Sequence, residues 1–139
     1  MNSYHGTSNV IAVNLVKGNV DVSLGGGELG QGFYTGEHLY LAKAWAFHIS
    51  GDKHKNVVQF STLDSEIECL SMEILDHGSA SLKRNELKKY KATRTYRFGV
   101  DLIWAPIVGK DKIVGDQYKW ESDPAALLLN GVSCKRSII

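Results

Sequence analysis

The sequence is poor in proline, has almost no net charge and contains no long run of apolar residues. Two prolines in 139 residues leave no proline-rich linker, so we expect residues 1–139 to form a single domain. No apolar run approaches the roughly 18–20 residues that a membrane-spanning helix needs. A net charge of +1 provides no overall field that would draw the chain to nucleic acid or to a membrane.

Cysteine is also scarce, and its placement excludes two common uses. Cys69 and Cys134 are too few for a disulfide scaffold and lack the spacing of a metal site. We therefore expect reduced thiols and no bound metal. The N-terminal stretch MNSYHGTS has no basic flank followed by an apolar segment, so it does not resemble a secretory signal. These absences favour a cytoplasmic protein.

The charges that are present are distributed unevenly along the middle of the chain. Residues 63–76 hold five acids and no base, whereas residues 83–97 hold seven bases and one acid. Neighbouring blocks of opposite sign can attract each other across a fold, which is one interpretation. The alternative is a basic surface that receives a phosphate-rich partner.

Periodicity and turn residues predict a mixture of helices and strands. The clearest helix spans residues 36–50, because apolar residues recur there at helical spacing and Gly51 follows. The mixture predicts an α+β fold. Strands are expected at residues 3–7, 9–27, 56–62, 66–73, 99–109, 115–122 and 132–139; further helices are expected in the first half of 79–96, capped by Ser79 or Ser81, and at 123–131, between Asp123 and Gly131 as caps.

The first stretch that suggests chemistry is YHGT, residues 4–7, where His5 ends a predicted strand and precedes Gly6. An imidazole at the rim of a sheet can donate to a ribose hydroxyl or act as a base. The glycine lets the backbone approach a ligand closely. A single histidine near a terminus is also commonly a hydrogen-bonded structural residue, so both interpretations stay open here.

The second stretch is GELGQGFYTG, residues 27–36, followed by AKAWAF at 42–47. Tyr34 and Trp45 lie 11 residues apart, with a turn and the start of a helix between them. If the helix folds back on the strand, the two rings can enclose a flat heterocycle such as nicotinamide or a base. The alternative is that both aromatic rings only fill the core.

The third stretch is DQYKWES, residues 116–122, which follows the apolar run DLIWAPIVG. Gln117 begins a predicted strand, where a polar side chain can reach the cleft that the sheet borders. An amide there can hydrogen-bond a ribose hydroxyl or a carboxamide. The alternative is a solvated strand start.

The order of these motifs, from Tyr4 to about Leu129, resembles the ADP-ribosyltransferase superfamily in its His–Tyr–Glu branch. Within that branch it is most similar to small bacterial toxin-like domains that carry a histidine–glycine pair, a GxGFYxT stretch and an alanine-rich helix with tryptophan. The resemblance implies a split β-sheet sandwich with a few helices. It also implies NAD-dependent transfer of ADP-ribose to a protein or nucleic acid, with release of nicotinamide.

The resemblance implies a role for each matching residue. His5 would contact the adenosine ribose of NAD, and the Gly6 backbone would pair with the nicotinamide carboxamide. Tyr34 and Trp45 would enclose the nicotinamide ring, and Gln117 stands where relatives carry the catalytic glutamate. The implied catalytic set is His5, Tyr34 and Gln117, and the implied NAD-binding set is His5, Gly6, Thr7, Gly32, Phe33, Tyr34 and Trp45.

The glutamine at position 117 departs from the glutamate of the family pattern. Glutamine orients a ribose but supplies neither a charge nor a base. Either Asp116, Glu121 or Glu37 compensates for it, or catalysis is slow or altered, or the chain only binds. Two alternatives stay open: an NAD glycohydrolase, with water as acceptor, and a non-catalytic module that binds NAD, ADP-ribose or nucleic acid. A toxin-like enzyme is also compatible with an antitoxin or immunity protein as partner.

Overall fold

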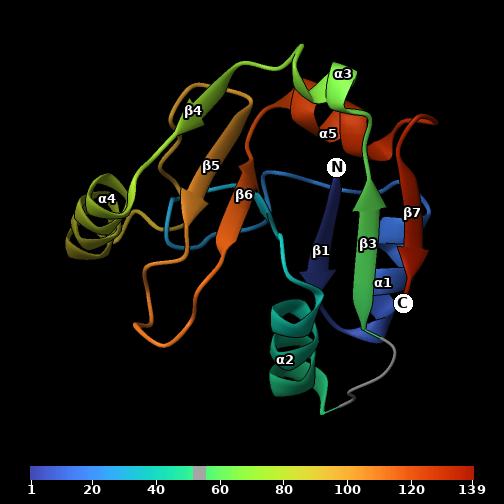
Figure 1. Cartoon of the computed structure of the whole chain (residues 1–139), viewed down its shortest axis with the longest axis horizontal. Coiled ribbons are helices and arrows are strands. Elements are labelled where there is room, and N and C mark those ends of the chain that lie inside the picture. The colour runs from blue at the N-terminus through green and yellow to red at the C-terminus, as the bar shows by residue number, and fades with distance from the viewer. Residues whose placement is uncertain (52–55) are drawn as a thin grey trace.

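The computed structural model describes residues 1–51 and 56–139, and the strands of this part form one sheet (Figure 1). The order is β4-β5-β6-β2-β1-β3-β7. β4 and β5 are parallel, and all other neighbours are antiparallel. The strands are β1 (Asn2–Gly6), β2 (Phe33–Gly36), β3 (Val57–Ser61), β4 (Met72–Ile74), β5 (Leu102–Pro106), β6 (Asp116–Trp120) and β7 (Lys135–Ile138).

The two halves of the sheet meet at β1 and β2, which share one residue pair, Tyr4 with Gly36. By contrast, four residue pairs join β2 to β6, and five join β1 to β3. At the next residue of β1, the ring Nδ1 of His5 lies 2.6 Å from the carbonyl oxygen of Tyr34. A side chain therefore links β1 to β2 at the point where the backbone ladder between them ends.

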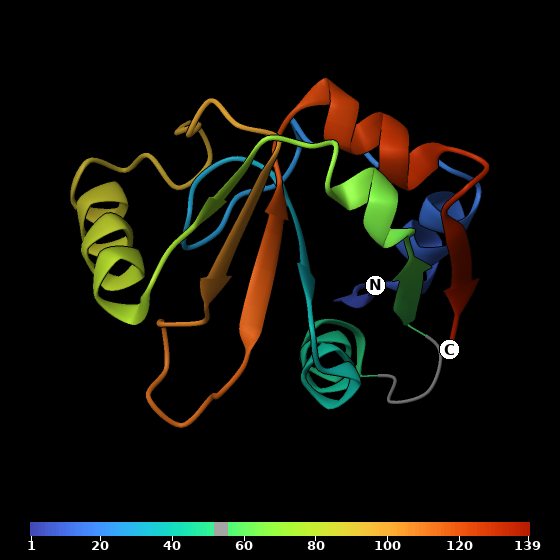
Figure 2. The ribbon, with the colours of Figure 1, turned by 45° about the horizontal axis from the view of Figure 1, so that its top comes forward.

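The described residues form five helices, and these cover both faces of the sheet. α1, α3 and α5 pack on one face around the largest core cluster. α2 and α4 pack on the opposite face, which we call the α2/α4 face. Figure 2 shows α3 and α5 together, away from α2 and α4. The helices are α1 (Asn9–Val16), α2 (Leu39–Ser50), α3 (Asp64–Ile67), α4 (His77–Lys89) and α5 (Asp123–Asn130).

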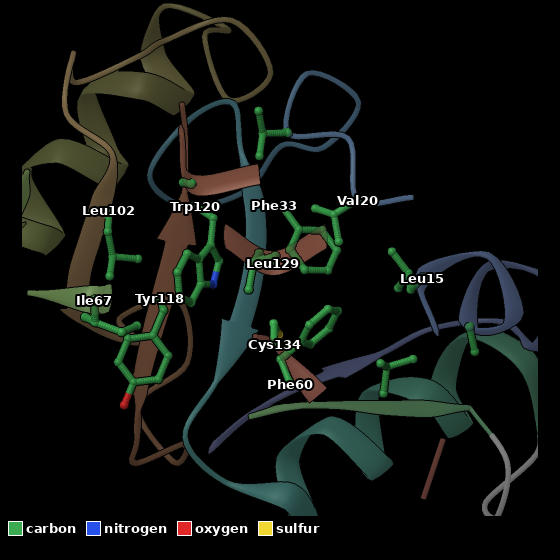
Figure 3. Packing of buried hydrophobic residues seen from close by; sticks show 14 residues of the cluster. Leu15, Val20, Phe33, Phe60, Ile67, Leu102, Tyr118, Trp120, Leu129 and Cys134 are labelled. Atoms are coloured by element: carbon green, nitrogen blue, oxygen red, sulfur yellow. The ribbon is translucent and has the colours of Figure 1, made fainter. Parts of the chain in front are cut away.

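Alternating side chains of the central strands separate these two faces. Trp120 is fully buried in the largest cluster near Phe33 and Leu129 (Figure 3), and its Nε1 donates to Thr35 Oγ1 at 2.9 Å. The next residue of β6, Lys119, points to the other face because successive side chains of a strand alternate. The result is a sheet buried on both sides over its central strands.

The expected strand at residues 9–27 is wrong, because its first part is the helix α1. The Ser8 side chain caps this helix by accepting from the backbone N–H of Ile11 at 3.5 Å. Ala12 and Leu15, three residues apart, are buried in the core. Burial of this helical face outweighs the strand preference of the valines and isoleucine in the segment.

The other expectations for local structure were confirmed or need smaller corrections. Residues 66–73 are not one strand: they include the end of α3 and the start of β4. Asp76 rather than a serine caps α4, accepting from the Ser79 N–H at 2.7 Å, and Ser122 rather than Asp123 caps α5. The α+β class is confirmed, and Gly51 ends α2 with a φ of 73°. In the described residues no helix has the length and apolarity to cross a membrane.

Candidate functional site

The candidate site lies on the α2/α4 face, over the neighbouring strands β2 and β6. Gln117 pairs with Gly36, and Lys119 pairs with Tyr34. Because side chains two residues apart share a face, Gln117 and Tyr34 project to the same side of the sheet. The structure therefore places two of the three residues expected to be catalytic on the same face of neighbouring strands.

The Gln117 side chain is held by its amide nitrogen. Nε2 donates to Oε2 of Glu28 at 2.9 Å and to the carbonyl oxygen of Pro106 at 3.2 Å. Both partners only accept, so the nitrogen and oxygen of this amide are distinguished by the network. The residue is 8% exposed, and no donor in residues 1–51 or 56–139 reaches Oε1. Within those residues the amide is held through Nε2 alone, so Oε1 can accept a hydrogen bond from a ligand.

Glu28 is the residue that sequence reasoning missed. It lies in the glycine-rich segment before β2, and three parts of the chain converge on its carboxylate. Oε2 also accepts from the backbone N–H of Val108 at 3.1 Å, and Oε1 lies 3.8 Å from Nε of Arg84 on α4. The one available signal is an acid inside GELGQG, next to the aromatic pair, and this signal is weak.

Tyr34 is anchored in the chain at its hydroxyl. The hydroxyl donates to the carbonyl of Gly30 at 2.6 Å and accepts from the N–H of Leu29 at 3.1 Å. Burial raises the pKa of the Tyr34 phenol well above its usual value. A side chain at Gly27 would begin 2.9 Å from the tyrosine ring, so glycine there lets the loop close over the ring.

His5 lies on the other face of the sheet from the Tyr34 ring. Its imidazole packs on Phe33, with 4.4 Å between ring centroids, and its Nδ1 is hydrogen-bonded to the Tyr34 carbonyl oxygen. Burial lowers the pKa of His5, although the hydrogen bond to that carbonyl opposes this effect. A carbonyl only accepts, so the proton of the neutral ring sits on Nδ1 and Nε2 is left as an acceptor.

Gly6 is covered by α2. A side chain at this position would overlap the carbonyl oxygen of Ala42, so glycine is required for the close approach of α2 to β1. Thr7 is buried, and its N–H donates to the carbonyl of Asn56 at 2.7 Å. Gly32 likewise makes room for the Lys119 side chain. These three members of the expected NAD-binding set have packing or backbone roles in the chain itself.

Trp45 lies on α2 and is 57% exposed. It is one helical turn from Leu41, and residues four apart on a helix share a stripe. Leu41 and His38 both lie against Gly115, at the start of β6. Trp45 continues this stripe one turn further along α2, at an exposed position. The ring contact given by the structure is with His48, at 6.0 Å.

The three acids expected to assist Gln117 are engaged elsewhere. Glu121 forms a buried ion pair with Lys119 at 2.6 Å. Asp116 accepts from Nε1 of Trp104 at 2.9 Å, and Glu37 accepts from the Asp116 N–H at 2.9 Å. In the described part of the chain none of the three bonds to the Gln117 amide, whereas Glu28 does.

A cavity of about 260 Å³ adjoins this network. Glu37 and Asp116 line it from the β2 and β6 side, His77 from α4 and Pro106 from the end of β5. The β5–β6 connection contributes Ile107, Val108, Lys110, Asp111, Ile113, Val114 and Gly115. Pro106 and Asp116 also flank Gln117, as its hydrogen-bond partner and its chain neighbour. The lining of this cavity is mixed, because Lys110 and Asp111 lie among the apolar residues of the β5–β6 connection.

The charged blocks do not attract each other through ion pairs. In residues 1–51 and 56–139, the pairs made by the basic block are Lys83 with Glu86 and Arg84 with Glu28. Neither partner belongs to residues 63–76. The described residues also contain no group of three or more His, Cys, Asp or Glu side chains that could hold a metal ion.

Comparison with known proteins does not assign this chain to a family. No family model matches it. The comparison with curated proteins likewise finds no relative.

Proposed function

We propose that this chain is an NAD-dependent ADP-ribosyltransferase. The observation that carries the proposal is the fixed amide of Gln117, whose free Oε1 lies on the same face as Tyr34. An acceptor oxygen beside an aromatic side chain suits a ribose hydroxyl next to a flat ring. The split sheet that the resemblance implies would divide between β1 and β2, which share one residue pair within the single seven-stranded sheet.

The proposed reaction breaks the bond between the anomeric carbon of the nicotinamide ribose and the ring nitrogen of nicotinamide. The electron pair of that bond stays on the ring nitrogen and neutralises its positive charge. An acceptor atom then bonds to the anomeric carbon and loses a proton. Gln117 Oε1 would accept from a ribose hydroxyl as positive charge develops on the sugar, and Trp45 would cover the nicotinamide ring.

The same pocket with water as acceptor would be an NAD glycohydrolase, and acceptor choice is the property that separates the two activities. The test incubates the purified chain with labelled NAD alone, with total cell protein and with total RNA. Nicotinamide release and label transfer are measured in each tube. Release with one macromolecular fraction supports the transferase and identifies the acceptor class, whereas release with NAD alone supports the glycohydrolase.

Two matched variants show whether the activity belongs to this site. Gln117→Ala is expected to lower nicotinamide release by about 10²–10³-fold, as loss of a transition-state hydrogen bond does. Gln59→Ala removes a glutamine from β3 of the same sheet, where its amide donates to Ser61 Oγ, and is expected to leave release unchanged. No release by the unmodified chain in any tube, together with tight NAD binding, would replace the enzyme with a binding module.

A further inference from the structure

We infer that Glu28 is the positioning residue of Gln117 and supplies the carboxylate charge that Gln117 lacks. This inference rests on the proposed function above. It starts from the contact between Gln117 Nε2 and Glu28 Oε2, which joins residues 89 positions apart in the sequence at 2.9 Å.

The first step concerns orientation. A primary amide has two N–H donors, and both are used here, by Glu28 and by the Pro106 carbonyl. A rotated amide would direct its oxygen at a carboxylate and a carbonyl, where no donor is available. Glu28 thereby excludes the rotated form and keeps Oε1 as the atom that is presented to a ligand.

The second step concerns charge. The N–H groups that donate to a carboxylate polarise the amide, which increases the negative charge on its oxygen. Oε1 of Gln117 therefore becomes a better acceptor than the oxygen of an isolated glutamine. A ribose hydroxyl that donates to it is stabilised further when positive charge develops on the sugar.

The third step concerns the support of Glu28 itself. The Val108 N–H fixes Oε2 from the β5–β6 connection, and Arg84 approaches Oε1 from α4. The Glu28 side chain is 22% exposed, so water screens this carboxylate only in part. Its position is set by the loop, the helix and the strand together, as a positioning residue requires.

The inference is tested by exchanging the two side chains. Glu28→Gln is expected to lower kcat by more than about tenfold with little change in KM for NAD, because a charge that acts in the transition state is lost. Gln117→Glu places two carboxylates in contact and is also expected to lower kcat. The double variant restores one amide facing one carboxylate, and should exceed both single variants by about tenfold. Glu68→Gln, an exposed acid at the end of α3, is the matched control.

A second measurement separates this inference from the proposed function. In the folded chain, the Gln117 side-chain NH₂ resonances should show hydrogen-bonded shifts and slow exchange, and both should change in Glu28→Gln. Full activity of Glu28→Gln in an active enzyme would overturn the inference and leave the function standing. Inactivity of the unmodified chain would overturn the function and the charge role, while free-amide NH₂ resonances would overturn the positioning role.

Discussion

Lys119 and Glu121 form an ion pair of 2.6 Å in which the side chains are 0% and 1% exposed. Lys119 Nζ also donates to the Leu29 carbonyl at 2.8 Å, and Glu121 accepts from the backbone N–H groups of Phe98 and Gly99. The pair therefore ties the end of β6 to two loops. It gives Glu121 a structural role on the candidate-site side of the sheet.

Breaking this pair is expected to destabilise the fold strongly. Glu121→Gln leaves a buried ammonium without its counter-charge and should lower the free energy of unfolding by about 3–5 kcal/mol. Urea unfolding of Glu121→Gln, Lys119→Met and the double variant measures the coupling. We expect the double variant to lose clearly less stability than the sum of the single variants; additive losses would show that the pair is not coupled.

Removing the Tyr34 hydroxyl should also reduce stability. Tyr34→Phe leaves the Leu29 N–H and the Gly30 carbonyl without their partner, which costs about 1–3 kcal/mol for buried groups. Tyr40→Phe is the matched control, because Tyr40 is 62% exposed and should change stability by less than about 0.5 kcal/mol. Equal effects of the two substitutions in thermal or urea unfolding would contradict the anchoring role of Tyr34.

Stability should fall as the solution becomes mildly acidic, because of His5. Burial lowers the pKa of His5 from its usual 6.5, so the folded chain favours the neutral ring. The stability that the neutral His5 ring contributes is fully present above pH 6.5. It is lost as the pH falls through the lower pKa that His5 has in the folded chain. Urea unfolding at intervals from pH 8 to 5 measures the slope. His5→Gln should flatten it, and an unchanged slope in that variant would assign the effect to other groups.

A methyl group at Gly6 should disturb the packing of α2. Gly6→Ala places a Cβ against the Ala42 carbonyl, and overpacking of this kind costs about 1–3 kcal/mol. Gly78→Ala in α4 is the control, since its new Cβ would lie 3.6 Å from its nearest neighbour, Asp76 Oδ1. Gly78→Ala should leave the free energy of unfolding unchanged or raise it by up to about 1 kcal/mol. A neutral Gly6→Ala would show that α2 can shift away from β1.

Local patterns in the sequence were sufficient for several elements. The helix at 36–50 was predictable because its buried positions, Ala42 and Ala46, repeat at helical spacing and Gly51 can adopt a positive φ. The apolar run 99–109 was predictable as a strand because β5 buries side chains on both faces, Leu102 on one and Ile103 and Ala105 on the other. The residues 9–16 were not predictable as a helix, because valine and isoleucine are compatible with either structure until the core is known.

The candidate site was likewise predictable from the sequence only in part. Short motifs in the sequence, YHGT, GQGFYT and DQYKWE, were enough to select His5, Tyr34 and Gln117 as polar or aromatic residues at strand ends and starts. The pairing of Glu28 with Gln117 was decided only by the tertiary structure, because the strand order places β6 beside β2 and so brings residue 28 to residue 117. Sequence patterns report the preference of each short segment. Contacts across 89 positions depend on how the whole sheet assembles.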